Sequence, residues 1–259
     1  MGERFSKAIV CAPAATFSDG LTSVSLGLPV FEKALEQHRA YCRALRAAGL
    51  EIDALEPDTD HPDSTFVEDP AVVTPDWAVL TRPGAPTRAG EVERIAQALS
   101  KYYDKIDAIQ PPGTLDGGDI CQIEDRFLIG ISDRTNEEGA GALNRILMAN
   151  GCTSSFVDIR ETPGILHLKS GLSYIGDSRL LVISSLADRI SVEGLELIIV
   201  PDGEEYAANC IRVNDHVLMP AGFPGLRGIL GGMKYHTVEL EMSEFQKMDG
   251  GLSCLSLRF

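Results

Sequence analysis

Apolar residues along this chain occur in closely spaced pairs of short runs, and a turn that carries an aspartate separates the two runs of each pair. Such β-rich runs are typical of strands, and Asp beside Gly, Pro or Asn is typical of a tight turn. The pattern therefore predicts four β-hairpins. They cover residues 71–81, 120–130, 172–183 and 210–219, with turns around Asp76, Asp125, Asp177 and Asp215.

Other segments carry the spacing of helices and of single strands. Apolar residues recur at helical intervals over 31–49, 91–103 and 136–151, and the last segment ends on a glycine stop signal. Short apolar runs predict five further strands, at 50–55, 105–109, 155–159, 196–200 and 237–241. The chain thus repeats a unit of strand, loop, hairpin and helix roughly every 40 to 50 residues, a period typical of propellers and solenoids.

The repeated unit predicts a closed ring. A unit with a parallel crossover cannot bury both faces of its sheet alone, so its copies must pack against one another. The segments 6–13 and 253–259 are both strand-like and would complete one blade together, which would also hold Cys254 firmly near the end of the chain. The predicted fold is α/β, a five-bladed propeller with pseudo-five-fold repeats of a ββαβ-type unit, forming a single catalytic domain over residues 1–259.

In a ring, the loops that lead into successive hairpins converge on the axis. These loops cover residues 63–70, 114–119, 165–171, 204–210 and 248–254. They bring together several carboxylates, His167 and Cys254, which are far apart in the sequence. We therefore expect one central pocket that contains a thiol, an imidazole and acidic groups.

Charge and cysteine spacing exclude several classes of partner. The formal net charge of -15 would repel nucleic-acid phosphates and anionic membrane surfaces. No apolar run approaches the roughly 20 residues that span a bilayer, and the start lacks the apolar stretch of a signal peptide, which predicts a cytoplasmic protein. The six cysteines form no C-x-x-C pair and show no zinc-finger spacing, so neither a disulfide framework nor a metal site is expected.

The predicted pocket favours a cationic substrate. A cysteine within reach of a histidine is suited to nucleophilic attack and proton transfer. Nearby carboxylates normally raise the pKa of a thiol and weaken it as a nucleophile, but a bound cation would favour the thiolate again. A guanidinium group would fit, because it could form charge-assisted hydrogen bonds with Asp63, Glu68, Asp69 and Asp249.

The sequence resembles the dimethylarginine dimethylaminohydrolase family along its whole length. The stretches that carry the resemblance are S-D-G-L-T-S, F-V-E-D-P, L-T-R-P-G-A-P-T-R, G-T-L-D-G-G-D, R-T-N-E-E-G, L-H-L-K-S-G-L-S-Y, Y-A-A-N-C and D-G-G-L-S-C-L-S, in the family's order. This family belongs to the guanidine-modifying superfamily of five-fold α/β propellers, the penteins. The resemblance implies hydrolysis of methylated arginine to citrulline and methylamine or dimethylamine, with no metal or organic cofactor.

The resemblance also implies a role for each matching residue. Cys254 would attack the guanidinium carbon, and His167 would protonate the departing amine and later activate water. Asp116 would orient His167, although some relatives have Glu at this position. Arg88 and Arg134 would hold the α-carboxylate of the substrate. The carbonyl groups of Leu21 and Met248 would hold its α-amino group.

Two alternatives stay open at the level of sequence. The first is an arginine deiminase or another amidine hydrolase of the same fold, which would release ammonia instead of a methylated amine. The second is a non-catalytic binding propeller, although such a protein would not need a cysteine, a histidine and a ring of carboxylates together. Exposed strand edges of a ring would permit a homodimer without requiring one.

Overall fold

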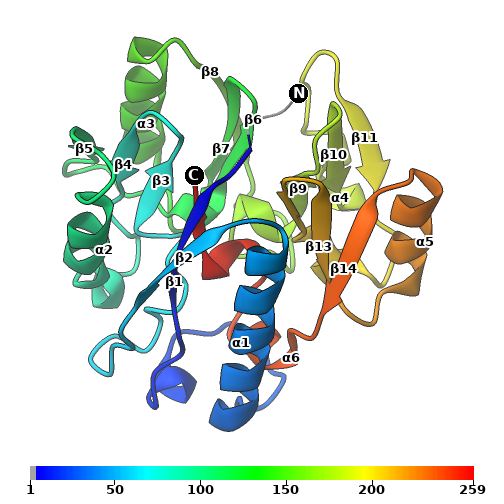
Figure 1. The fold of residues 1–259 in the computed structure, drawn as a ribbon. Helices are drawn as coiled ribbons and strands as arrows, with labels where there is room; N and C mark the ends of the chain where they lie inside the picture. The colour runs from blue at the N-terminus through cyan, green and yellow to red at the C-terminus, as the bar shows by residue number, and fades with distance from the viewer. Residues whose placement is uncertain (1–3) are drawn as a thin grey trace.

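The computed structural model describes residues 4–259, which form five three-stranded sheets arranged around a common centre (Figure 1). In each sheet the middle strand pairs antiparallel with the inner strand and parallel with the outer one. Four sheets use consecutive strands: β3 (Ala71–Val73), β4 (Ala78–Leu80) and β5 (Ile106–Ala108); β6 (Ile120–Ile123), β7 (Arg126–Ile131) and β8 (Thr153–Asp158); β9 (Leu172–Tyr174), β10 (Arg179–Val182) and β11 (Glu196–Ile199); β12 (Ile211–Val213), β13 (His216–Pro220) and β14 (His236–Leu240).

These four sheets confirm the strands and hairpins expected from the sequence. Each predicted hairpin supplies an inner and a middle strand, and each crossover strand becomes the outer one. Asp177 adopts a positive φ of 54° in its turn, as does Asn214 next to Asp215. The local Asp and Asn signals were therefore reliable, because these residues tolerate the left-handed backbone that a tight turn requires.

The fifth sheet joins the two ends of the described chain. Its strands are β15 (Leu257–Arg258), β1 (Lys7–Cys11) and β2 (Glu51–Leu55), in that order. The register places Ile9 opposite Leu257, and the carbonyl oxygen of Phe259 accepts hydrogen bonds from the amides of Ser6 and Lys7 at 2.9 and 2.8 Å. The expected ring closure is confirmed, and Cys254 lies just before the strand that completes the ring.

Deletion of residues 255–259 is expected to prevent stable folding. It removes β15 and the side chains of Leu255, Leu257 and Phe259, which are at most 9% exposed. Each such loss costs about 2–5 kcal/mol, against a total stability of about 5–15 kcal/mol. Thermal unfolding followed by circular dichroism should show no cooperative transition, whereas the exposed-residue control Leu28→Ala should unfold like the parent. A truncated protein with the parent's transition temperature would contradict closure by β15.

Helices cross from the middle strand to the outer strand of each sheet. They are α1 (Phe31–Ala47), α2 (Glu91–Leu99), α3 (Glu137–Ala149), α4 (Ser184–Ala187) and α5 (Pro224–Gly232), and a further short helix, α6 (Ser243–Gln246), precedes β15. Three of them agree with the helical patterns, and α3 begins with Asn136 as its N-cap, which accepts a hydrogen bond from Gly139. The helix predicted at 91–103 is shorter than expected, because α2 ends at Leu99. The chain then turns and packs Tyr102 and Tyr103 against Phe259.

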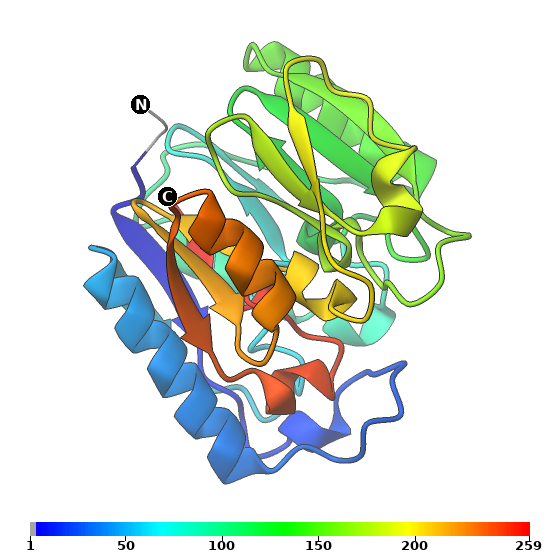
Figure 2. The same cartoon turned by 90° about the vertical axis from the view of Figure 1, so that its right-hand side faces the viewer.

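The helix α5 had no signal in the sequence pattern, because its segment contains four glycines, which disfavour helix. It forms because Leu226 and Leu230, four residues apart, are fully buried against the sheet that it covers (Figure 2). No helix within residues 4–259 combines the length and apolar character needed to span a membrane.

A short 3₁₀ turn precedes the inner strand in four of the five sheets. These turns are η3 (Gly117–Asp119), η4 (Leu168–Ser170), η5 (Glu205–Ala208) and η6 (Ser253–Leu255). Asp116 and His167 occupy the same station, one residue before η3 and η4, and Cys254 lies inside η6. The repeat therefore places residues of distant sequence at equivalent positions around the axis.

Candidate active site

A small central cavity of about 30 Å³ collects the residues that the sequence predicted, with the exception of Glu68. It has room for little more than one water molecule, so a substrate can enter only after the surrounding loops move. Phe66, Leu166 and Gly250 complete its wall, and these were not predicted. The predicted residues that line it are Leu21, Asp63, Asp69, Arg88, Asp116, Arg134, His167, Met248, Asp249 and Cys254.

His167 is held by Asp116 at the wall of this cavity. Its Nε2 atom lies 3.1 Å from Oδ2 of Asp116, and both side chains are buried. The other oxygen of Asp116 accepts a hydrogen bond of 2.8 Å from the amide of Gly84, and the Asp116 amide donates to Oγ1 of Thr135. The shorter Asp side chain therefore reaches the histidine, as the resemblance implied for an acidic residue here.

Surrounding charge keeps His167 protonated. Burial disfavours the imidazolium, but the charge of Asp69, the hydrogen bond to Asp116 and the charge of Asp119 outweigh it and raise the pKa of His167 to about 9. Asp69 responds in the opposite sense: burial favours its neutral form, yet the charges of His167 and Arg88 lower its pKa to about 2. At neutral pH the site therefore contains an imidazolium beside a carboxylate.

Cys254 is a neutral thiol in the same state. Burial and the charges of Glu68 and Asp69 raise its pKa to about 12, while the amide of Gly251, 3.4 Å from Sγ, and the charge of Lys169 act against this shift. A cation bound between the carboxylates would lower the pKa of the thiol again. The electrostatics expected from the sequence are therefore present around this sulfur.

Arg88 is largely committed to the protein. Its Nε and Nη2 atoms donate to Glu91 at 3.0 and 2.7 Å, Nη2 also donates to the carbonyl oxygen of Phe66, and Nη1 donates to Asp69. One N–H of Nη1 is left for a substrate carboxylate. Glu91 was not predicted, although its position three residues after Arg88 is a common ion-pair spacing. In contrast, the guanidinium of Arg134 forms no hydrogen bond or ion pair with the described residues 4–259.

Glu68 lies behind the cavity instead of in its wall. Its carboxylate accepts a hydrogen bond of 2.7 Å from Oγ of Ser253 and forms an ion pair of 2.5 Å with Nζ of Lys169. The amide of Glu68 donates to the carbonyl oxygen of Cys254 at 3.2 Å. Lys169 and Ser253 were missed in the sequence, even though they belong to the same short motifs as His167 and Cys254.

The loop that carries Leu21 covers the cavity through the acidic residues themselves. The amide of Leu21 donates to both oxygens of Asp63 at 3.1 and 3.2 Å. The amide of Ser23 donates a hydrogen bond of 2.5 Å to Oδ2 of Asp249, and the Ser23 hydroxyl donates one of 3.1 Å to the same atom. These are two of the carboxylates expected to hold the guanidinium, so loop position and substrate binding involve the same groups.

Asp69, Asp116 and His167 place one potential metal ligand each within 4.8 Å of one another. These atoms already have partners, however, because Asp69 is bonded to Arg88 and Asp116 to Gly84. His167, whose pKa is raised to about 9, carries protons on both ring nitrogens at neutral pH and offers no lone pair to a metal. The arrangement fits proton transfer better than metal binding.

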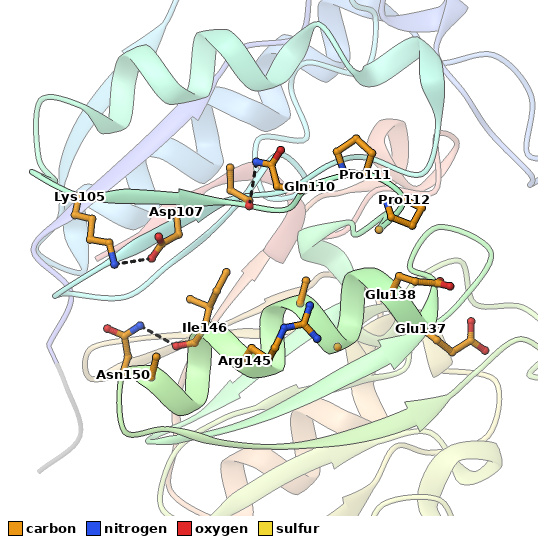
Figure 3. Close-up of a pocket in the computed structure, with 15 residues that line it drawn as sticks. Lys105, Asp107, Gln110, Pro111, Pro112, Glu137, Glu138, Arg145, Ile146 and Asn150 are labelled. Carbon is orange, nitrogen blue, oxygen red and sulfur yellow. Dashed lines mark hydrogen bonds and ion pairs between the residues drawn. The ribbon is translucent and has the colours of Figure 1, made fainter.

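A larger hollow of about 570 Å³ lies between β5 and α3 (Figure 3). The side chains of Lys105, Asp107 and Arg145 border it, and Lys105 pairs with Asp107 at 3.2 Å. Among the described residues that line it there is no cysteine or histidine. Its size is therefore no indication of a catalytic role.

Several known proteins are similar to this chain in sequence. A family model described as arginine deiminase matches residues 92–216. The N(G),N(G)-dimethylarginine dimethylaminohydrolase of Pseudomonas aeruginosa is 44% identical over 98% of this chain and 100% of its own length. The enzyme of the same name from Streptomyces coelicolor is 34% identical over 97% of this chain and 96% of its own length.

Solved structures of dimethylarginine dimethylaminohydrolases are also similar to this chain. A dimethylarginine dimethylaminohydrolase from Pseudomonas aeruginosa, a cysteine-to-serine mutant complexed with citrulline, has a TM-score of 0.95 and 43% identity and covers 99% of this chain and 100% of its own. A second dimethylarginine dimethylaminohydrolase structure, a histidine-to-glycine mutant as its adduct with S-methyl-L-thiocitrulline, has a TM-score of 0.94 and 44% identity and covers 98% of this chain and 100% of its own. The N-terminal domain of a cyanobacterial arginine dihydrolase shares the fold at 18% identity, with a TM-score of 0.83 and coverage of 99% and 97%.

The five-bladed α/β propeller and the family that the motifs indicated are thus both confirmed. The chain belongs to the dimethylarginine dimethylaminohydrolase family.

Proposed function

We propose that this protein hydrolyses Nω-methylated arginine to citrulline and methylamine or dimethylamine. The observation that carries the proposal is the meeting of a thiol, a protonated imidazole and several carboxylates in one central cavity. The relative from Pseudomonas aeruginosa is named for this reaction, and one of its structures contains citrulline. The geometry supports the same chemistry here.

We assign the binding of the guanidinium to the carboxylates of the cavity wall, Asp63, Asp69 and Asp249. Glu68 would act on the site from behind, through its backbone bond to Cys254 and its charge. Arg134 and the remaining N–H of Arg88 would hold the α-carboxylate, and the carbonyl groups of Leu21 and Met248 would hold the α-amino group.

The first half of the reaction replaces the amine by sulfur. The bound cation promotes loss of the Cys254 proton to solvent, and the thiolate attacks the guanidinium carbon to form a neutral tetrahedral adduct. The His167 imidazolium then donates its proton to the methylated nitrogen, the C–N bond breaks, and the amine leaves. A positively charged alkylthiouronium attached to Cys254 remains, next to a neutral His167.

The second half regenerates the thiol. Neutral His167 takes a proton from water, the hydroxide adds to the same carbon, and the C–S bond breaks as the urea carbonyl of citrulline forms. The hydroxyl proton of this second adduct returns to the sulfur. The proton that the thiol first released to solvent is finally bound by the free amine, so protons and charge balance.

A substrate panel tests the proposal. Citrulline formation should be faster from monomethylarginine and asymmetric dimethylarginine than from arginine. Preference for unmodified arginine would instead favour an arginine deiminase, which the partial match to that family model keeps as the second candidate. For a non-catalytic binding propeller, we expect no turnover and no labelling of Cys254 by an amidine reagent such as 2-chloroacetamidine, as detected by mass spectrometry.

The pH profile of kcat/KM is expected to fall as pH rises through about 9. His167 must carry a proton to release the amine, and its raised pKa keeps that proton up to about pH 9. Asp69 is the first of the charges that raise this pKa. Asp69→Asn should therefore move the falling limb to lower pH, apart from any general loss of activity; an unmoved limb would contradict the assignment to His167.

Three further points stay proposals. The ring closure supports one catalytic domain over the described residues, and a cytoplasmic location stays a prediction from the sequence. The outer strands β2, β5, β8, β11 and β14 end their sheets and would permit two copies to pair. Sedimentation of the purified protein distinguishes a monomer of 27.9 kDa from a homodimer.

A further inference from the structure

Behind Cys254, a buried asparagine connects the loop of the nucleophile to the loop of the histidine. Asn209 directly follows η5 and is 5% exposed. Its Nδ2 atom donates to the carbonyl oxygen of Lys169 at 2.9 Å and to Oγ of Ser253 at 3.0 Å. Its Oδ1 atom accepts a hydrogen bond of 2.9 Å from the amide of Ser253. Both N–H groups and the carbonyl of this amide are thus used.

Both of its partners lie within two residues of His167 or Cys254 in the sequence. Lys169 belongs to η4, which begins directly after His167, and Ser253 precedes Cys254 within η6. The three segments come from three different repeats of the ring. A second connection between the same loops passes through Glu68, which binds Lys169 and Ser253, but only Asn209 among these groups fixes backbone atoms on both sides.

The nucleophile loop is shaped to receive this asparagine. A Cβ atom on Gly251 would lie 2.5 Å from Cγ and 2.6 Å from Oδ1 of Asn209, closer than real contacts allow. Gly251 does not have a positive φ. The second glycine of the D-G-G stretch is therefore required by the approach of Asn209 and not by backbone conformation.

We propose that Asn209 is a positioning residue that sets the approach of Cys254 to His167. It does not line the cavity, so it acts through the two loops and not on the substrate. Because its amide is neutral, it can hold both loops without adding a charge beside the thiol and the imidazolium, whose protonation depends on the charges around them. The inference rests on the proposed function, since it assigns a role within that reaction.

The principal test is the kinetic effect of Asn209→Ala. A misplacement of reacting groups by about 1 Å costs about 100-fold in rate, so kcat should fall by about 100-fold. KM should change less than kcat, by about threefold, because Asp63, Asp69 and Arg134 bind the substrate from other loops. The matched control is Asn214→Ala. Asn214 donates to the carbonyl oxygens of Phe5 and Ala48, far from the cavity, so this variant should lose stability but keep the parent's kcat.

Gly251 provides a test of the mechanism. Gly251→Ala should also lower kcat, because the added methyl group displaces the Asn209 side chain. The three atoms nearest to this methyl group, all within 3 Å, belong to the side chain of Asn209 and are absent from alanine. The double variant Asn209→Ala/Gly251→Ala should therefore be no slower than Asn209→Ala alone. Additive losses would show that Gly251 acts independently of Asn209 and would overturn the proposed fit.

Labelling of Cys254 separates this inference from the proposed function. The rate at which 2-chloroacetamidine modifies Cys254 should fall at least tenfold in Asn209→Ala and stay unchanged in Asn214→Ala, whether or not methylarginine is the substrate. Should Asn209→Ala not fold, the uncharged Asn209→Leu, which has a similar size but no hydrogen-bonding side-chain atoms, must show the same slow labelling. Labelling and kcat within twofold of the parent in a folded Asn209 variant would overturn the inference.

Discussion

Cys254→Ser is expected to lower turnover by at least about 10⁴-fold while leaving the fold intact. The surroundings already raise the pKa of the Cys254 thiol to about 12, and even a bound cation could not make the far less acidic serine hydroxyl a comparable nucleophile. The sulfur atom accepts one weak hydrogen bond, from the amide of Gly251, and an oxygen can replace it there. Citrulline production and thermal unfolding of the purified variant measure the two effects.

The matched control for this substitution is Cys42→Ser. Cys42 is buried in α1 and lies 3.7 Å from Nδ1 of His38, so a hydroxyl finds a polar partner there. This variant should keep the activity of the parent. If Cys254→Ser retained more than a few per cent of the parent's kcat, Cys254 would not be the nucleophile.

His167→Gly should stop the reaction at the departure of the amine, with a loss of at least about 10³-fold. An alkylamine anion is a very poor leaving group, so C–N cleavage depends on the proton that His167 carries below a pKa of about 9. A thiolate needs no such proton. The Cys254 thiolate should therefore still attack the isothiourea carbon of S-methyl-L-thiocitrulline and expel methanethiolate in the variant, and the thiouronium adduct should accumulate because no base activates water. Mass spectrometry of the protein after mixing would detect it.

His236→Gly provides the control for this second substitution. His236 is exposed on β14, away from the cavity, and its loss should change kcat by less than twofold. Equal rates of amine release in the parent and in His167→Gly would assign the acid to another group.

Much of the fold could be predicted from local signals. The turns at Asp76, Asp125, Asp177 and Asp215 were visible because a tight turn depends on a few neighbouring residues. Ring closure could be inferred because 6–13 and 253–259 both had strand character and no other partner. The helix α5 could not be predicted, because its glycines disfavour helical structure. Only the burial of Leu226 and Leu230 against its sheet stabilises this helix.

The sequence predicted which loops meet at the site, because the repeat places them on the axis of the ring. It did not predict which way each side chain of those loops faces. Glu68 and Asp69 are adjacent in sequence, yet they face different sides of the same loop: Asp69 towards the cavity and Arg88, Glu68 towards Lys169 and Ser253. Nothing in the F-V-E-D stretch distinguishes them. The role of Asn209 was hidden for the same reason, since hydrogen bonds between loops of different repeats depend on how blades pack.

The pairing of β1 with β15 has a consequence for synthesis of the protein on the ribosome. Strands β2 to β14 are all translated after β1 and before its partner Leu257–Arg258, so one edge of β1 stays open while they are made. The edge that a nascent-chain chaperone would need to shield is that of Lys7–Cys11.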